Sequence, residues 1–99
     1  MVYLPYMETE LIYYKKYNPS PQHIVEIKVW KVPKDTHKPH GYKYSLVLIE
    51  DGKRVIGYDN GEQKGDHRHY YLKEEKYNFS TLKKLQNDFL DDVWRYLNA

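Results

Sequence analysis

The dipeptide Asp51-Gly52 constrains the fold more than any other feature of this chain, because it separates two apolar runs. Asp-Gly favours a two-residue turn that joins two antiparallel strands and sets their register. Such a turn pairs Glu50 with Lys53 and places Tyr44 opposite Asp59. Because side chains alternate between the two faces of a sheet, one face is then expected to carry Tyr44, Leu46, Leu48, Val55 and Asp59. A carboxylate is therefore predicted at the end of an apolar face.

Runs rich in β-branched and aromatic residues predict strands over Glu10–Tyr17, Ile24–Val32, Tyr42–Ile49 and Arg54–Tyr58. Apolar residues then recur at spacings of three and four, which predicts a C-terminal helix with Ser80 as its N-cap. A helix with one apolar face has to pack on the sheet. We expect a single α+β domain over residues 1–99, a small antiparallel sheet of four to five strands packed by a C-terminal helix. Residues 1–8 are expected as a loosely held terminus or a first extended segment, and Trp30 and Trp94 in the core or at its edge.

Composition narrows the class of protein. The 99 residues include no cysteine, which excludes disulfides, thiol catalysis and cysteine-based zinc sites and fits a reducing cytosol. No apolar run approaches the roughly 18 residues that a membrane span needs, so we expect a cytoplasmic protein without a membrane partner. The net charge of +2 gives no global sign of nucleic-acid binding. A basic segment from Lys28 to Lys43 fits phosphate binding and solvated edge lysines about equally well.

The segment Lys64–His69, KGDHRH, concentrates groups that carry protons or bind anions. If it is extended, His67 and His69 lie on one face, about 7 Å apart. Two imidazoles at that spacing suit a general base and a general acid on either side of a phosphodiester. Metal-independent RNA cleavage also needs a cation for the transition state, and Lys64 or Arg68 could supply it.

Sequence chemistry leaves two other interpretations of this segment open. A polar stretch with two histidines is more often a solvated turn than a site, and composition by itself slightly favours the turn. An H-x-H pair also occurs as two metal ligands on one strand, and His37 and His40 could complete such a site.

The run from His40 to Tyr71, HGYKYSLVLIEDGKRVIGYDNGEQKGDHRHYY, combines a Y-D-N element with KGDHRH. This combination resembles the TumE family of small prokaryotic toxin–antitoxin proteins. The upstream EIKVWKVP (Glu26–Pro33) and the C-terminal helix fit the same pattern, whereas the residues up to about Ser20 lie outside it. The resemblance implies the toxin of a type II toxin–antitoxin system, encoded beside a DNA-binding antitoxin, with ribonuclease activity as the expected mode of toxicity. By position, the motif residues are His40, Lys43, Tyr58, Asp59, Asn60, Lys64, Asp66, His67, Arg68 and His69.

The favoured hypothesis is a cytoplasmic toxin that cleaves RNA without a metal or a cofactor. The catalytic residues would be His67 and His69, as general base and general acid, with Asp59 orienting an imidazole. Lys64 and Arg68 would hold phosphate, and the full set of expected substrate-binding residues is Lys43, Tyr58, Asn60, Lys64, Arg68 and His40. The expected partners are RNA and a cognate DNA-binding antitoxin that lies over or near KGDHRH; whether the chain forms a homodimer is left open.

Two rival hypotheses differ in class. A non-enzymatic module would bind RNA or a protein and form a complex with a DNA-binding antitoxin, using its tyrosines and the basic segment as the contact surface. A metal-dependent nuclease would instead use His40, Asp59, His67 and His69 as ligands.

Overall fold

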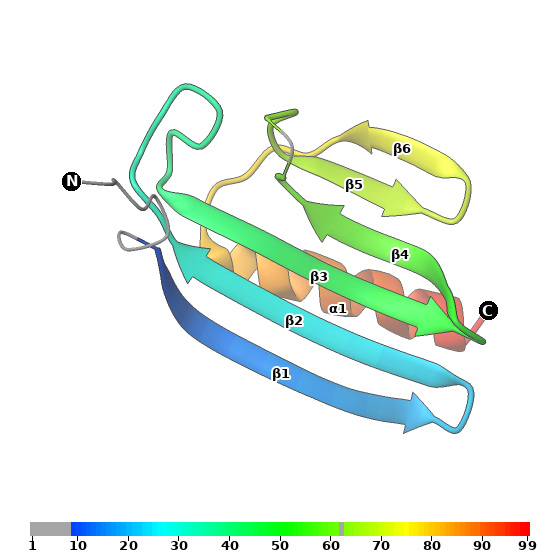
Figure 1. Ribbon diagram of the computed structural model, residues 1–99. Coiled ribbons are helices and arrows are strands. Elements are labelled where there is room, and N and C mark those ends of the chain that lie inside the picture. The colour runs from blue at the N-terminus through cyan, green and yellow to red at the C-terminus, as the bar shows by residue number, and fades with distance from the viewer. Residues whose placement is uncertain (1–8, 62) are drawn as a thin grey trace.

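The computed structural model describes residues 9–61 and 63–99, which form one antiparallel sheet of six strands and one helix. The predicted α+β architecture is confirmed, while the expectation for residues 1–8 lies outside the described residues. The strands lie side by side in chain order, and the helix covers one face of the sheet (Figure 1). The elements are β1 (Glu10–Ser20), β2 (His23–Lys31), β3 (Tyr42–Glu50), β4 (Lys53–Asp59), β5 (His67–Tyr70), β6 (Lys73–Lys76) and α1 (Leu82–Leu97).

The two faces of the sheet differ in what they carry. In Figure 1 the helix lies behind the sheet, so the viewer looks onto the face without the helix, which we call the open face. The opposite, helix-covered face holds the core, whose buried members include alternate residues of β2 and β3: Val25, Ile27, Val29, Tyr44, Leu46 and Leu48. The residues between these core positions point to the open face.

The sheet has six strands where the sequence predicts four to five, because the polar segment after β4 forms a second hairpin. A solvated turn is therefore the wrong interpretation for His67, Arg68 and His69, which belong to β5. The sequence of β5 has no alternation of apolar and polar residues. Its polar side chains instead form ion pairs with charged residues of neighbouring elements. His67 pairs with Asp59 of β4, and Arg68 pairs with Asp92 of α1.

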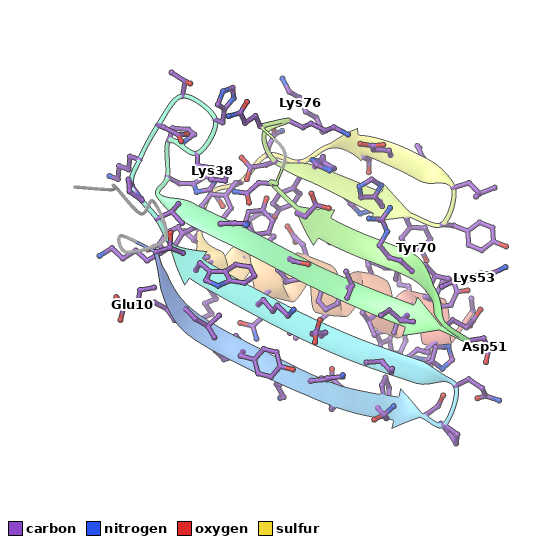
Figure 2. All side chains as sticks on the ribbon, in the orientation of Figure 1. Glu10, Lys38, Asp51, Lys53, Tyr70 and Lys76 are labelled. Carbon is purple, nitrogen blue, oxygen red and sulfur yellow. The ribbon has the colours of Figure 1, made fainter. Side chains whose placement is uncertain are left out.

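The predicted two-residue turn between β3 and β4 is confirmed. Asp51 and Gly52 both have positive φ, 48° and 80°, and Glu50 lies opposite Lys53. Figure 2 shows Asp51 and Lys53 at this turn, and Lys38 at the far end of the sheet in the loop before β3.

A β-bulge then shifts the register of this hairpin by one residue. Ile49 lies opposite Arg54 as predicted, but Leu48 lies opposite Ile56, because β4 contributes the extra residue Val55. Val55 and Ile56 are both buried, at 7% and 0% exposure. The bulge thus lets two consecutive apolar residues enter the core.

The shifted register places Asp59 on the opposite face from the one predicted. Asp59 pairs with Ser45 instead of Tyr44. Its neighbour Tyr58 points to the helix-covered face and is buried. The expectation that Asp59 ends the apolar face is therefore wrong, and its carboxylate lies on the open face.

The helix packs through the predicted apolar stripe, in which Leu85, Phe89 and Val93 are buried. Its N-cap is Thr81 instead of Ser80, because the Thr81 hydroxyl accepts the Lys84 N–H at 3.1 Å. Trp94 is 66% exposed, so its expected place in the core or at its edge is wrong. Among the described residues, α1 falls short of the length and apolar content that crossing a membrane requires.

Candidate active site

Asp59 of β4 and two histidines of β5 meet on the open face. Asp59 lies opposite His67 in the β4–β5 register, and His69 follows two residues later on the same face. Nε2 of His67 lies 3.0 Å from Oδ1 of Asp59, and Nε2 of His69 lies 3.7 Å from Oδ2. The ring centroids of the two imidazoles are 4.9 Å apart. The structure thus brings together the three residues that we nominate as catalytic from the sequence.

His67 is held between two hydrogen-bond acceptors. Its Nδ1 lies 3.1 Å from the carbonyl oxygen of Gly65, and its Nε2 faces the carboxylate of Asp59. A carbonyl oxygen can only accept, so Nδ1 carries a proton and donates it. A carboxylate also accepts, so both contacts are satisfied when Nε2 is protonated as well. Both ring nitrogens of His67 therefore face acceptors.

The surroundings of His69 favour the neutral form. Burial lowers the pKa of His69 below its usual value, and the positive charge of Arg54 lowers it further. The carboxylates of Asp59 and Glu74 oppose this shift, but they stand 3.7 and 3.9 Å from the ring nitrogens, beyond hydrogen-bond distance. The two imidazoles at Asp59 thus have different surroundings, because His67 contacts two acceptors at hydrogen-bond distance and His69 faces its carboxylates from farther away.

Asp59 and the two histidines line a groove of about 420 Å³ on the open face. Its fixed cations are Lys43, Arg54 and Lys64, and its carboxylates are Asp59 and Glu74. Positive charges therefore exceed carboxylates in the groove, which favours anionic ligands. Of the residues predicted to bind substrate, Lys43 and Lys64 are in this lining.

Arg54 is a groove residue that the sequence analysis missed. Strict alternation along β4 puts residues 54 and 59 on opposite faces, and the bulge at Val55 brings them to the same face. The Arg54 side chain lies over Gly57, where a Cβ would stand 2.9 Å from Cδ of Arg54. Nη1 of Arg54 comes within 4.0 Å of Oδ2 of Asp59. A glycine inside a strand often marks such a close approach, and this signal was present in the sequence.

Two predicted substrate-binding residues, Tyr58 and Arg68, lie on the helix-covered face with Asp92 of α1. The Tyr58 hydroxyl donates to Oδ2 of Asp92 at 2.6 Å, and Nε of Arg68 donates to the same oxygen at 2.6 Å. Tyr58 and Asp92 are 2% and 3% exposed. The structure places both residues away from the groove, so neither can contact a substrate bound there.

Asn60 and His40 are also engaged within the protein. Asn60 is buried, accepts the N–H of Tyr44 at 3.0 Å and donates to the carbonyl of Tyr42 at 2.7 Å. His40 accepts the N–H of Tyr42 at Nδ1, so its proton is on Nε2, which faces Asp66 at 2.9 Å. Asn60 thus ties the end of β4 to β3, and His40 ties the start of β3 to the loop before β5; neither lines the groove.

A divalent metal could be held by Asp59, His67 and His69, whose donor atoms all lie within 4.8 Å of one another. Two imidazoles and one carboxylate form a donor set that suits first-row transition metals. His40 does not join this cluster, because both of its ring nitrogens have partners at Tyr42 and Asp66. The four-ligand site that includes His40 is therefore not assembled.

The comparison with known families agrees with the motif. The family described as Toxin TumE matches residues 6–97, nearly the whole chain, and the protein belongs to this toxin family. The match begins at residue 6 and includes β1, so the expectation that the residues up to about Ser20 lie outside the family pattern is wrong. No curated protein and no solved structure matches the chain. Membership supports a toxin role and implies, in general, an antitoxin partner.

Proposed function

We propose that this toxin inhibits growth in the cytoplasm as a metal-independent ribonuclease, and that a cognate DNA-binding antitoxin neutralises it. The observation that carries the proposal is the pair of imidazoles at Asp59, His67 between two acceptors and His69 with a lowered pKa, in a groove whose fixed cations outnumber its carboxylates. Acid–base cleavage of RNA needs such a pair, because one group has to accept a proton while another supplies one.

The surroundings of the two rings favour His69 as the base and His67 as the acid, which reverses the roles expected from the sequence. Neutral His69 removes the proton of a ribose 2′-hydroxyl, and the 2′-oxygen forms a bond to the neighbouring phosphorus. The bond from phosphorus to the 5′-oxygen breaks, and His67 transfers its Nε2 proton to that leaving oxygen. Asp59 holds this proton in the resting protein, and the bond from Nδ1 to the Gly65 carbonyl keeps the imidazole in place while the proton is transferred. The products are a 2′,3′-cyclic phosphate and a 5′-hydroxyl.

Arg54 and the groove lysines stabilise the charge that develops on the phosphorane. Arg54 reaches the Asp59 end of the groove, whereas Arg68 faces α1. Positioned cations act most strongly where the transition state carries more charge than the substrate.

Gly57→Ala is expected to slow RNA cleavage about as much as Arg54→Ala does, by up to about 10²-fold. The new methyl group would displace the Arg54 side chain, because it would stand 2.9 Å from Cδ. Adding Gly57→Ala to Arg54→Ala should then change little further, since the two changes act through one side chain. Cleavage rates of the two single variants and the double variant measure this coupling, and additive effects would contradict it.

The same three residues support a second candidate, a metal-dependent nuclease, because their donor atoms lie within 4.8 Å of one another. In that case a bound metal ion would supply the nucleophilic water, and cleavage would leave different ends. The non-enzymatic module is the third outcome, with RNA bound and no product formed.

Cleavage of single-stranded RNA by the purified toxin in EDTA tests the proposal. We expect full activity in EDTA, products ending in 2′,3′-cyclic phosphate, and no cleavage of DNA of the same sequence, which lacks the 2′-hydroxyl. Loss of activity in EDTA with recovery on adding a divalent metal would replace the proposal with the metal mechanism. Salt-dependent RNA binding without products at any metal concentration would identify a binding module.

A further inference from the structure

Trp30 lies on the open face of β2 and lines the same groove as the two histidines. It is opposite Lys43 of β3 in the register, and Nζ of Lys43 stands 5.3 Å from the centre of the indole ring. The core residues of β2, by contrast, are Val25, Ile27 and Val29, which point to the helix-covered face. The indole is thus not part of the packing under α1, and the core does not account for its position.

A large aromatic side chain beside cations, on a sheet face without a covering helix, is the arrangement that proteins use to bind single-stranded nucleic acid. The ring stacks on a base, and nearby lysines or arginines contact the phosphates. The groove offers Lys43, Arg54 and Lys64 for this purpose, against the carboxylates of Asp59 and Glu74. This excess of positive charge favours an anionic RNA strand over a neutral or cationic partner.

Trp30 lies too far from the histidines for its indole to stack on a base of the nucleotide that is cleaved. Trp30 is on β2 and the histidines are on β5, three strand spacings away, or roughly 15 Å across the sheet. A base stacked on Trp30 therefore belongs to a residue of the strand outside the scissile linkage.

We propose that Trp30 and Lys43 form a base-stacking subsite that holds single-stranded RNA in the groove, away from the scissile phosphate. This subsite rests on the proposed ribonuclease function for its role but can be measured without cleavage. It requires a single strand, because bases in a duplex do not expose their faces.

The chain offers a matched control, because its two tryptophans lie in different places. Trp94 is on α1, is 66% exposed and has no part in the groove lining. Trp94→Phe leaves Trp30 as the only indole, and Trp30→Phe leaves Trp94. A 2′-O-methyl RNA of roughly ten nucleotides serves as the probe, since it spans such a site and cannot be cleaved through its 2′-oxygen.

We expect this RNA to quench the fluorescence of the Trp94→Phe variant and to leave that of Trp30→Phe unchanged. Trp30→Ala should weaken RNA binding about 5- to 150-fold, the loss produced by removing one base stack. Trp94→Ala should bind like the wild type, and Trp30→Tyr should recover part of the affinity. Circular dichroism and thermal unfolding of each variant establish that the affinities compare folded proteins.

Equal quenching of both tryptophans, or wild-type affinity of Trp30→Ala, would overturn the subsite. If Trp30→Ala keeps its RNA affinity but no longer co-purifies with the antitoxin, Trp30 is a protein contact and the RNA assignment is wrong. Weaker RNA binding by Trp30→Ala in a protein that never cleaves RNA would support the subsite and overturn the ribonuclease proposal. If Trp30→Ala cleaves RNA normally and binds it with unaltered affinity, the ribonuclease proposal is supported and the subsite is overturned.

Discussion

Replacing His69 with alanine is expected to slow RNA cleavage by about 10²- to 10⁴-fold, because the reaction then lacks a positioned base. His67→Ala should cost a similar factor through loss of the acid. The double variant should be little worse than the poorer single variant, since the two groups act in one step. Single-turnover cleavage of a labelled RNA measures all three rates.

The control for this experiment is His37→Ala, which changes an exposed histidine in the loop before β3. It should cleave like the wild type. Thermal unfolding of the variants separates loss of chemistry from loss of structure, because His67 is largely buried at Asp59. Cleavage at the wild-type rate by a folded double variant would rule out both assignments.

The pH dependence of cleavage provides a second readout of the same assignment. A base works only in its neutral form, so activity should fall as the pH drops through the pKa of His69. This pKa is lowered by burial and by Arg54, so the fall should lie below about 6.5, the usual histidine value. Arg54→Gln removes the repulsive charge and should move the fall to higher pH. An unchanged acidic limb in this variant would contradict the role of His69 as the base.

Asp92→Ala is expected to lower the free energy of unfolding by about 1.5–3 kcal/mol, because it removes a buried carboxylate that accepts two hydrogen bonds and leaves Arg68 paired with Glu75 alone. Asp92 is 3% exposed and accepts hydrogen bonds from Arg68 and from the Tyr58 hydroxyl at 2.6 Å each. Burial raises the pKa of Tyr58, and its hydrogen bond to Asp92 raises it further. Urea denaturation followed by circular dichroism measures the loss.

Two further variants test whether loss of the Arg68–Asp92 ion pair is the cause. Asp91→Ala removes an exposed carboxylate from the neighbouring position and should change stability by less than about 0.5 kcal/mol. The double variant Arg68→Met/Asp92→Leu removes both charges and should recover most of the stability. If it is no more stable than Asp92→Ala, the loss comes from packing and not from the broken Arg68–Asp92 ion pair.

The antitoxin and the RNA are expected to compete for the toxin if the antitoxin lies over or near β5, as the motif led us to expect. The groove and its histidines are on the open face, where no element of the described chain covers them. Covering this face would block the proposed chemistry directly.

Local chemistry in the sequence was enough to predict several features correctly. Asp51-Gly52 specified a tight hairpin, because few other residues accept positive φ at both turn positions. The apolar spacing from Leu82 onward specified a helix with one buried face. The H-x-H spacing placed His67 and His69 on one face as soon as that segment was extended, since alternate residues of a strand share a face.

Only the tertiary structure decided which residues join those histidines. The bulge at Val55 depends on how well two consecutive apolar side chains pack under α1, and it turns Asp59 to the open face, where Arg54 already lies. The β5 strand is stabilised by ion pairs with partners distant in sequence, so it has no local apolar signature. Arg68 lies between the two histidines in the sequence but faces the helix, where its ion-pair partner Asp92 lies. Periodicity and turn chemistry are local and can be read from the chain, whereas the partner of a charge is set by the packing of the whole fold.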